Sequence, residues 1–435
     1  MSNYYLAIDL GASSGRHIVG YQKGDLLALD EVYRFKTLME ESPDGLVWDL
    51  KRIFNEIKTG IKEAFKKYPN ITSLSIDTWG VDYILINKDK EIAPFYAYRN
   101  ERNAAASKCV NEIIPFNELY KLIGVQFASF NTIYQLYADK MEGRLNKATD
   151  YLMIPSYFIY KLTGIKTHEY TDESTTSLIN PYNGKYLTSL LEKLEFPKKL
   201  FKKISFAGDY VGELLPEIAE EVGGNCKVVL CATHDTASAF EAVDLEEESI
   251  LISSGTWSLI GIKIPSPIIT DKSLKANYTN EGGVGYIRFL KNIMGMWINN
   301  RLKKQIDISQ EYIDMNVDST NYNGTFDVND PSLLAPTSMK EAVIKLIDKE
   351  PPKNDLELFA CVYRSMALSY KKAIEELENI TGKQFKKIVI VGGGAKNKYL
   401  NRLVEEYTNK RVIAMPIEAT ALGNIKVQMK ANKEL

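Results

Sequence analysis

The sequence is poor in the residues that build disulfide frameworks and transition-metal sites. Its 435 residues include only four cysteines, Cys109, Cys226, Cys231 and Cys361, and no two of them form a C-x-x-C pair. It has three histidines, His17, His168 and His234. These counts argue against a disulfide scaffold and against a zinc site, and they favour a reducing compartment.

A strong net charge and long apolar runs are also missing. The formal net charge is -2 at pH 7, which gives no electrostatic case for nucleic acid or for an anionic membrane surface. No uninterrupted apolar run approaches the ~20 residues of a membrane span. The first residues lack the basic start and the apolar region of a signal peptide. We therefore expect a cytoplasmic protein with no nucleic-acid partner and no membrane partner.

The composition that remains is that of an ordinary globular protein. Hydrophobic residues make up 45% of the chain and charged residues 25%, so a large core is possible. At roughly 150 residues per domain, the length predicts two or three domains.

The most informative stretch runs from Thr233 to Ala239. The apolar run before it, residues 228–232, predicts a buried strand, and residues 236–243 predict the start of a helix. Asp235 would then lie at a strand-to-helix turn, close to the positive end of the helix dipole. A carboxylate there can act as a general base, ligate magnesium or cap the helix, and spacing alone leaves all three open.

The first stretch with a recognisable pattern is a predicted β-hairpin. An apolar strand ends in Asp9, a turn of small residues follows over Gly11–Gly15, and residues 17–21 read as a second strand. Neither a Rossmann fingerprint nor a Walker A loop occurs here. The free N–H groups and hydroxyls of the turn can still cradle phosphate oxygens, although an ordinary hairpin turn looks the same.

Two further predicted strands each lead into a turn that contains glycine. Residues 48–67 have helical spacing, and the strand that follows over residues 73–77 ends in Asp77, three residues before Gly80. A glycine at that place would let a ligand approach the backbone closely. A long amphipathic helix over residues 355–379 precedes a buried strand, residues 387–391, which ends in three glycines.

A second hairpin, residues 250–262, repeats the pattern of the first. It consists of an apolar run, a Ser-Ser-Gly-Thr turn and another apolar run. Two similar hairpins about half a chain apart indicate an internal duplication with two similar domains.

Taken together, these stretches resemble the actin-like ATPase superfamily and, within it, the sugar kinases of the FGGY family. The matching stretches follow the expected order along the chain: DLGASSGR (9–16), IDTWGVD (76–82), YQL (134–136), HDTASA (234–239), SSGTWS (253–258), TNEGG (279–283), KNIMG (291–295) and VGGG (391–394).

The resemblance implies an α/β fold of two ribonuclease-H-like domains with an ATP and sugar cleft between them. We expect an N-terminal domain, residues 1–245, that carries the sugar and the base, and a C-terminal domain, residues 246–435, that carries the nucleotide. The implied reaction is ATP-dependent phosphorylation of a sugar, with L-rhamnulose, phosphorylated at its 1-hydroxyl, as the first candidate substrate.

Roles for individual residues follow from the same resemblance. Asp235 would be the catalytic base, and Asp9 would help to hold Mg²⁺, through water. Asn300 stands where the family is expected to carry a glutamine at the nucleotide, which is a departure from the pattern. The residues expected to face the sugar are Gly80, His234, Asp235, Thr236 and Asn292, and those expected to face ATP are Ala12, Ser13, Ser14, Gly15, Arg16, Thr256, Asn300 and Gly393.

Two alternatives remain open. One is a kinase of the same family for another ketose or polyol, such as L-fuculose or L-xylulose, because the fold does not fix the sugar. The other is an ATP-switched binding protein of the actin or chaperone type, which would not need a base that faces a sugar hydroxyl. In either case we expect a monomer or a small homo-oligomer.

Overall fold

The structure is a computed structural model that describes residues 3–24, 26–415 and 418–434. The chain divides into two compact units that alternate along the sequence. Unit 1 contains Met1–Asp244, Lys263–Phe289 and Ala419–Leu435, and unit 2 contains Leu245–Ile262 and Leu290–Glu418. The domain limits 1–245 and 246–435 stay a prediction. The cleft for ATP and sugar also stays a prediction.

Unit 1 mixes strands and helices. Its strands are β1 (Tyr4–Leu10), β2 (Gly15–Lys23), β3 (Leu26–Phe35), β4 (Met39–Ser42), β5 (Gly45–Trp48), β6 (Ile71–Thr78), β7 (Tyr83–Asn87), β8 (Lys90–Glu91), β9 (Asp150–Met153), β10 (Ile179–Asn180), β11 (Lys185–Tyr186), β12 (Tyr210–Glu213), β13 (Lys227–Val229) and β16 (Thr279–Gly282). Its helices are α1 (Leu50–Lys67), α2 (Arg102–Ile113), α3 (Phe116–Ile123), α4 (Thr132–Met141), α5 (Ile154–Thr163), α6 (Tyr170–Glu173), α7 (Thr188–Lys193), α8 (Pro216–Val222), α9 (Asp235–Ala242), α10 (Asp271–Lys275) and α16 (Ala419–Ala431), with short 3₁₀ turns at η1 (Leu145–Lys147), η2 (Ser174–Thr176) and η3 (Lys198–Leu200).

The main sheet of unit 1 has the strand order β12-β13-β6-β1-β2-β3. Strands β1 and β2 form the predicted hairpin, with antiparallel register from Tyr4 opposite Tyr21 to Leu10 opposite Gly15. Strand β6 runs parallel to both β1 and β13. The carboxyl ends of these three strands therefore lie at one edge of the sheet, where binding groups gather in open α/β sheets.

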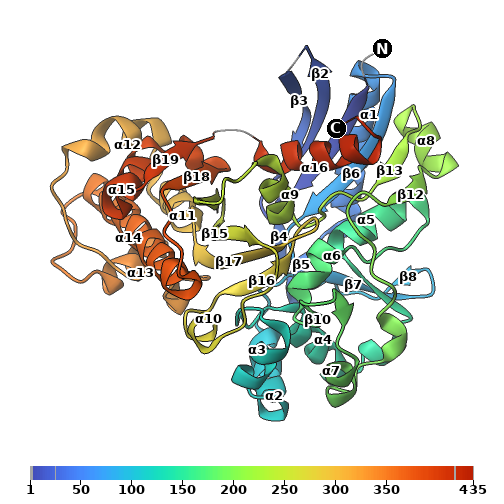
Figure 1. Cartoon of the computed structure of the whole chain (residues 1–435), viewed down its shortest axis with the longest axis horizontal. Helices are drawn as coiled ribbons and strands as arrows, with labels where there is room; N and C mark the ends of the chain where they lie inside the picture. Colours follow the sequence, from blue (N-terminus) through green and yellow to red (C-terminus); the bar gives the residue numbers. More distant parts are fainter. Residues whose placement is uncertain (1–2, 25, 416–417, 435) are drawn as a thin grey trace. The chain divides into compact units, whose positions relative to one another are not determined.

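Side chains of β1 alternate between the two faces of this sheet, as the period of a strand requires. Leu6 and Ile8 belong to the core on the α1 side, where α1 buries one apolar stripe. Tyr5 and Ala7 pack instead against Ile425 and its neighbours on α16. Figure 1 shows α16, the last helix of the chain, beside α9. The sheet is thus covered on both faces, one of them by the C-terminal helix.

The middle of unit 1, residues 100–225, is built mainly from helices. A three-stranded sheet, β8-β7-β9, adds to them, and the short strands β10 and β11 pair with each other. An apolar core fills this region, with Leu119, Ile133, Tyr151 and Leu190 among its buried members.

Unit 2 contains the second predicted hairpin. Its elements are β14 (Ser249–Ser254), β15 (Trp257–Ile264), β17 (Ile287–Met294), β18 (Lys387–Val391), β19 (Arg411–Ala414), α11 (Trp297–Ile306), α12 (Gln310–Asn316), α13 (Met339–Leu346), α14 (Asp355–Thr381), α15 (Lys398–Thr408), η4 (Val317–Ser319), η5 (Pro331–Leu333) and η6 (Gly393–Lys396). Strands β15 and β17 each have a few residues that count with unit 1.

The sheet of unit 2 repeats the pairing of unit 1. Five strands follow the order β17-β15-β14-β18-β19. Strand β14 pairs antiparallel with β15 and parallel with β18, just as β1 pairs with β2 and β6. Each sheet thus has a hairpin next to a parallel strand. The prediction of two domains with similar architecture is confirmed.

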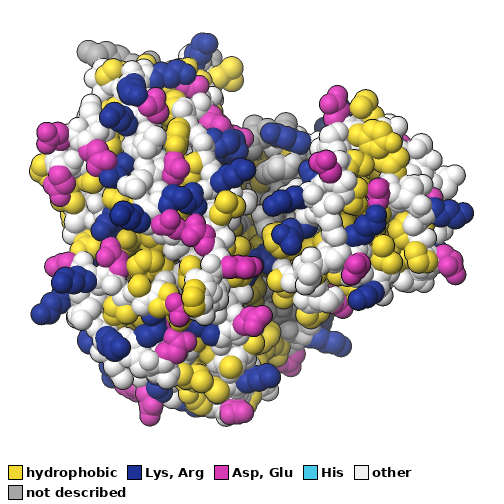
Figure 2. Space-filling model, turned by 180° about the vertical axis from the view of Figure 1, so that it is seen from behind, with side chains coloured by type: hydrophobic (Ala, Val, Ile, Leu, Met, Phe, Trp, Pro, Cys, Tyr) yellow, Lys and Arg dark blue, Asp and Glu magenta, His cyan; other side chains and the backbone are white. Residues whose placement is uncertain are grey.

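The surface carries charge of both signs. Figure 2 shows one face of the molecule, on which Lys and Arg side chains are interspersed with Asp and Glu. This distribution agrees with the small net charge of the chain. Among the residues that the structure describes, none of the helices is both long and apolar enough to cross a membrane.

Candidate active site

Asp235 is the first residue of helix α9, so the predicted strand-to-helix turn is present. The N-cap position belongs to His234, whose backbone is extended, with φ -80° and ψ 123°. The N-cap residue of α9 is therefore His234 and not Asp235. Thr236 donates a hydrogen bond from Oγ1 to Oδ1 of Asp235 over 3.0 Å. The carboxylate is thus oriented by its neighbour at the positive end of the helix.

Three carboxylates lie at the same edge of the unit 1 sheet. Asp9 and Asp77 are direct Cα partners in the parallel pair β1 and β6. The segment before α9 continues this edge, because the Thr78 N–H donates to the Thr233 carbonyl over 2.8 Å. Asp235 follows two residues later. Asp77 was expected at the end of its strand but without a role, because the strand pairing that sets it beside Asp9 is tertiary.

The pKa values of Asp235 and Asp77 are both raised, by burial and by neighbouring carboxylates. Burial and, next to it, the charge of Asp9 raise the pKa of Asp235 to about 7. Although 30% of the Asp235 side chain remains accessible, protein atoms crowd it closely enough to remove much of its hydration. Burial, Asp9 and Asp235 also raise the pKa of Asp77 well above its usual value. Groups with such shifts mark candidate sites for proton transfer.

The carboxylates at this end of the sheet, which we call the acid edge (Asp9, Asp77 and Asp235), suit a hydrated divalent cation. Arg16 donates from Nη2 to Oδ2 of Asp9 over 2.6 Å. Oδ2 of Asp77 accepts from Asn424 Nδ2 over 2.5 Å, whereas its buried Oδ1 accepts no hydrogen bond within the described part of the chain. In the same described ranges, no group of three or more acidic, histidine or cysteine side chains is placed to ligate a metal directly. Asp9 and Asp77 supply carboxylate oxygens, the type of ligand that hard divalent cations prefer.

The turn of the first hairpin presents backbone and hydroxyl groups next to these acids. The Gly11 N–H donates to the Ser14 carbonyl over 3.0 Å, which closes the turn, and Ser13 is exposed at its tip. Gly15 is different, since an added Cβ would lie 2.4 Å from the Phe35 ring. Packing against Phe35 alone therefore explains that glycine, while the turn before it is open to a ligand.

Side chains from three segments converge on Gly80. A Cβ at that position would lie 3.2 Å from Nε2 of His234, 3.3 Å from Oδ1 of Asp172 and 3.3 Å from Oγ1 of Thr175. Such distances are tighter than ordinary contacts, so only glycine fits without displacing these polar groups. The structure therefore brings Gly80 next to His234, Asp172 and Thr175.

Asp172, Glu281 and Arg288 are polar residues of this region that sequence analysis did not select. Both carboxylate oxygens of Asp172 are buried and accept no hydrogen bond from the described residues. Burial, with Glu173, Glu169 and Asp235, raises its pKa well above the usual value. Glu281 lies in the TNEGG stretch, but no pattern in the sequence marks Asp172 or Arg288. Their segments are distant in sequence from the strands that they approach.

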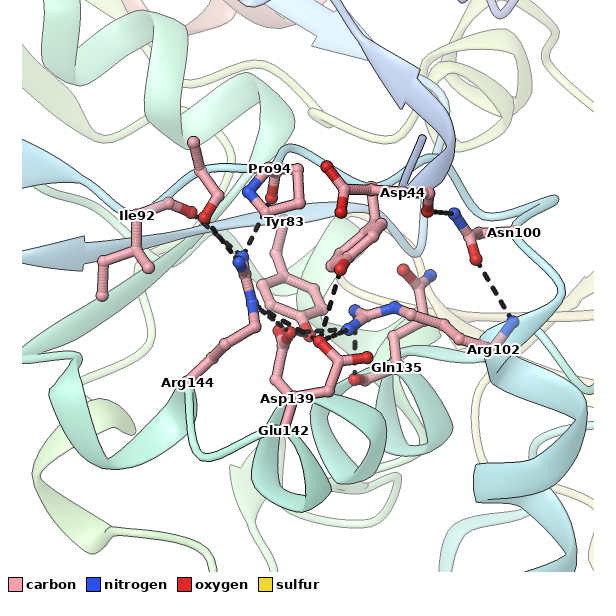
Figure 3. A network of polar contacts seen from close by, with 12 residues as sticks. Asp44, Tyr83, Ile92, Pro94, Asn100, Arg102, Gln135, Asp139, Glu142 and Arg144 are labelled. Carbon is pink, nitrogen blue, oxygen red and sulfur yellow. Dashed lines mark hydrogen bonds and ion pairs between the residues drawn. The ribbon is translucent and has the colours of Figure 1, made fainter. Parts of the chain in front are cut away.

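A buried network holds the segment that follows Gly80. Asp82 accepts from the indole N–H groups of Trp48 and Trp79, over 2.7 and 3.0 Å, and from Nε2 of Gln135 over 3.0 Å. Gln135 leads on to a second cluster, in which Arg102 and Arg144 both donate to Asp139 (Figure 3). These contacts come from the end of β5, the start of α2, helix α4 and the segment that follows α4. They fix the backbone on which Gly80 lies.

The residues predicted to face the nucleotide in unit 2 lie at one end of its sheet. Ser253 pairs with Val391 across the parallel strands β14 and β18, so the turns that follow both strands meet. Gly392 and Gly394 pack on Ser254, and Cβ atoms there would lie 2.9 Å from its carbonyl oxygen and 1.9 Å from its Oγ. A Cβ at Gly393 would touch no described atom within 4 Å, which leaves this exposed glycine open to a ligand.

Thr256 and Asn300 belong to the same end of unit 2. The Gly295 N–H donates to the Thr256 carbonyl over 3.2 Å, and the Met296 N–H donates to the Gly255 carbonyl over 2.9 Å. Helix α11 starts directly afterwards, with Asn300 exposed in its first turn. Asn292 lies half-buried on β17 of this unit. The structure therefore gathers Thr256, Asn300 and Gly393 within unit 2 and Asp9, Gly80 and Asp235 within unit 1.

Comparison with protein families gives two matches that together cover most of the chain. The N-terminal domain of the FGGY family of carbohydrate kinases matches residues 4–240, and the C-terminal domain of the same family matches residues 250–432.

Individual relatives are similar over the full length. A rhamnulokinase of Halalkalibacterium halodurans is 41% identical, with 100% of this chain and 94% of that protein covered. A rhamnulokinase of Bacillus subtilis is 37% identical, with 99% and 91% covered.

Solved structures share the fold at much lower identity. A gluconate kinase of Lactobacillus acidophilus superimposes with a TM-score of 0.84 at 16% identity, covering 100% of this chain and 90% of that one. A Plasmodium falciparum glycerol kinase with ADP gives 0.78 at 14%, again with 100% and 90% covered.

Proposed function

The chain belongs to the FGGY family of carbohydrate kinases, and from that membership we propose that it is a rhamnulokinase. The proposed reaction transfers the γ-phosphoryl group of ATP to the 1-hydroxyl of L-rhamnulose, as a step of rhamnose catabolism. As a family member, the chain takes a sugar and ATP as substrates and works with a divalent metal, for which we propose Mg²⁺. The full-length similarity to rhamnulokinases supports this choice of sugar.

The position of Asp235 is the observation that carries the reaction type. Its carboxylate begins helix α9, beside His234 and at the acid edge of the sheet. A sugar hydroxyl needs an acceptor for its proton as it attacks phosphorus, and a carboxylate within ~3 Å suffices. With its pKa raised to about 7, Asp235 is a stronger base than an ordinary aspartate and is still ionised at neutral pH in a large fraction of molecules.

The sugar-facing roles go to groups beside Asp235 in unit 1 and to one residue of unit 2. We assign Gly80, His234, Thr236 and Asn292 to sugar binding, with Asp235 as the base that removes the hydroxyl proton. Gly80 leaves room for the close approach of side chains, His234 offers a ring nitrogen 3.5 Å from the Asp235 carboxylate, and Thr236 orients that carboxylate. Correct placement supplies much of the rate in phosphoryl transfer.

The nucleotide-facing roles go to turns at the ends of strands. We assign ATP to residues Ala12–Arg16 of the first hairpin turn and to Thr256, Asn300 and Gly393 of unit 2. Turn amides and hydroxyls bind phosphate oxygens well. Asp9 would hold the hydrated cation, which, when bound, neutralises charge on the phosphates. Arg16, already paired with Asp9, can turn toward phosphate when that carboxylate binds the hydrated cation.

The setting of the reaction follows from its substrate and from the thiols. All four cysteines are free, which is typical of a reducing compartment where ATP is plentiful, and we propose the cytoplasm. We further propose a monomer or small homo-oligomer that takes neither nucleic acid nor membrane as a partner.

Coupled ADP release tests the proposal. The purified chain would be assayed with ATP and Mg²⁺, with and without L-rhamnulose, and then with L-fuculose and L-xylulose. We expect a large rate that depends on L-rhamnulose. A response to another ketose alone would keep the mechanism and replace the substrate. Slow turnover that no sugar changes would overturn the kinase and favour an ATP-switched binding protein.

The variant Asp235→Asn tests the base. The amide keeps the shape and cannot accept the proton, so we expect turnover to fall by roughly 10²–10⁴-fold. ATP binding, measured by calorimetry, should be retained. Asp44→Asn, which changes an exposed carboxylate of the same unit, is the control. Turnover at the wild-type level in Asp235→Asn would remove Asp235 from its role.

A further inference from the structure

The His234 ring lies between two charged partners. Its Nε2 is 3.5 Å from Oδ1 of Asp235, and its Nδ1 is 3.2 Å from Nη2 of Arg288. Arg288, near the start of β17, is completely buried. No sequence motif marked it, and the roles assigned above do not use it.

Arg288 is held by more than the imidazole. Its Nε donates to the Gly282 carbonyl over 2.7 Å and its Nη2 to the Thr171 carbonyl over 3.4 Å. Nη1 is 3.2 Å from Oε2 of Glu281, which balances its charge. Because a planar guanidinium with these partners has a fixed orientation, the direction in which Nη2 points at His234 is fixed as well.

This contact decides which ring nitrogen of His234 carries hydrogen. A guanidinium has only donors and does not lose its proton in proteins, so Nδ1 must be the acceptor. The hydrogen of the neutral ring is then on Nε2, the nitrogen that lies near Asp235. Burial and the positive charge of Arg288 both lower the pKa of His234 well below its usual value, which agrees with a neutral ring.

Glu281 offers the opposite influence. Its Oε2 is 3.6 Å from Nδ1 of His234, and a carboxylate there would favour hydrogen on Nδ1. Arg288 is closer, at 3.2 Å, and it is itself paired with the same Oε2 atom. Arg288 therefore donates to Nδ1, which leaves this nitrogen without a hydrogen of its own. The same arginine pairs with Glu281, the carboxylate that would otherwise accept a hydrogen bond from Nδ1.

We propose that Arg288 is a positioning residue that holds His234 neutral with its hydrogen on Nε2, so that Nε2 donates to an oxygen of the sugar beside the hydroxyl that Asp235 deprotonates. The second half rests on the proposed function. The chemistry is complementary: Asp235 accepts a proton from one oxygen, and His234 donates a hydrogen bond to another. A sugar oxygen that can only accept, such as a carbonyl or ring oxygen, requires this form of the ring.

Nitrogen NMR of the intact protein tests the first half directly. With ¹⁵N-labelled histidine there are only three rings to assign, and His234→Gln identifies one of them. The other two are internal references: His17 Nε2 faces the Ile57 carbonyl over 3.0 Å, and His168 Nδ1 faces Glu173 over 2.8 Å. We expect hydrogen on Nε2 of His234 in the wild-type protein. Hydrogen on Nδ1, or a doubly protonated ring, at pH 7.5 would overturn the inference.

Substitution of the arginine gives the second spectroscopic arm. In Arg288→Met the acceptor role of Nδ1 loses its partner, so the His234 signals should move toward the other neutral form or the charged form. Arg364→Met changes an arginine of unit 2 and should leave the His234 signals unchanged. If Arg288→Met does not fold, the wild-type spectrum still decides the tautomer. A folded Arg288→Met protein with unchanged His234 signals would contradict the role of Arg288.

Kinetics separate positioning from a purely structural effect. Arg288→Lys cannot reproduce the fork of contacts, so kcat/KM for the sugar should fall by roughly 10- to 100-fold while KM for ATP changes little. In a His234→Gln background, the amide can donate without help, so Arg288→Lys should cost at most about twofold more. An equal loss in both backgrounds would mean that Arg288 acts on the fold and not through His234.

The two proposals fail in different ways. If the wild-type spectrum shows hydrogen on Nε2 but no sugar raises ADP release, the proposed function is wrong and the tautomer assignment holds. If L-rhamnulose raises ADP release but the spectrum shows another form of His234, the kinase holds and the role of Arg288 is wrong.

Discussion

Asp235 owes its unusual basicity to burial and to a charge that is distant in the sequence. Burial raises its pKa most, and the charge of Asp9, on the first strand, adds to the effect. Asp9 also raises the pKa of Asp77, its cross-strand partner on β6. A charge that costs free energy in the resting site is available for chemistry when a hydroxyl proton must be removed. The residue therefore gains its role from its surroundings rather than from its own type.

The pH dependence of the reaction follows from this pKa. Asp235 must be ionised to act as base, and its pKa is raised to about 7, so lowering the pH through 7 protonates it. We expect kcat/KM for the sugar to rise from pH 5.5 to pH 8.5 with a midpoint near neutrality, about three units above an ordinary aspartate. Initial rates over this range, with ATP saturating, measure it. A profile that is flat down to pH 5.5 would contradict the raised pKa.

At the scale of secondary structure, α9 is positioned by another helix. Gly423 of α16 faces Ser238 of α9 so closely that an added Cβ would lie 1.7 Å from the Ser238 carbonyl oxygen. This contact involves backbone on both sides and cannot be relieved by turning a side chain. The place of α9, and with it the place of Asp235, depends on the absence of a side chain at one position of the last helix.

The substitution Gly423→Ala should therefore force α9 and α16 apart. We expect a loss of at least about 2 kcal/mol in the free energy of unfolding, toward the upper end of overpacking effects, together with a loss of turnover. Urea unfolding and the ADP-release assay measure the two effects. Lys430→Ala, at an exposed position of the same helix, serves as the control. Wild-type stability in Gly423→Ala would mean that the helices do not pack at this glycine.

The three glycines after β18 divide into two kinds, although the sequence shows them as one run. Gly392 has a φ of 81°, and both Gly392 and Gly394 pack against Ser254. Gly393 has neither constraint and is exposed between them. Two of the glycines are thus required by the fold, and only the middle one is free to serve a ligand.

A pair of substitutions distinguishes these roles. Gly393→Ala should fold normally and raise KM for ATP several-fold, which corresponds to a loss of about 1 kcal/mol in the free energy of ATP binding. Gly394→Ala should instead lower the melting temperature, because its Cβ would lie 1.9 Å from Oγ of Ser254. Steady-state kinetics and calorimetry compare the two proteins. If KM for ATP is unaffected in Gly393→Ala, this glycine does not face the nucleotide.

At the scale of the whole molecule, the chain contains two similar sheets, one in each unit. The last helix of the chain packs on the first of them. Helix α16 belongs to unit 1, where its residue Asn424 donates to Asp77 and Gln428 donates to the Leu6 carbonyl over 3.0 Å. Its apolar side covers Tyr5 and Ala7 of β1. The first and last segments of the sequence therefore complete a single core.

Removal of residues 419–435 should consequently unfold unit 1. We expect a protein that loses cooperative thermal unfolding and becomes open to limited proteolysis within the first 244 residues. A deletion of 433–435, which keeps α16, is the matched control. If the longer deletion melted like the intact chain, α16 would not be part of the core of unit 1.

Local pattern was enough to predict most of the elements and the order in which they come. Apolar runs on either side of small-residue turns gave both hairpins, helical spacing gave the start of α1 within two residues, and the short apolar run before Gly392 gave β18. Gly80 and Asp235 could be selected because they were expected in turns after strands, where sheet geometry concentrates binding groups, whereas His234 was selected through the family resemblance.

The order of strands, turns and helices can thus be read from local pattern, together with the residue types at the ends of the strands. Only the tertiary structure set Asp77 beside Asp9, Asp172 beneath Gly80 and Arg288 against His234. The reason is physical: periodicity is a property of neighbours within about ten residues, whereas a pKa and a tautomer depend on charges within a few ångströms, and strand pairing brings those from anywhere in the chain.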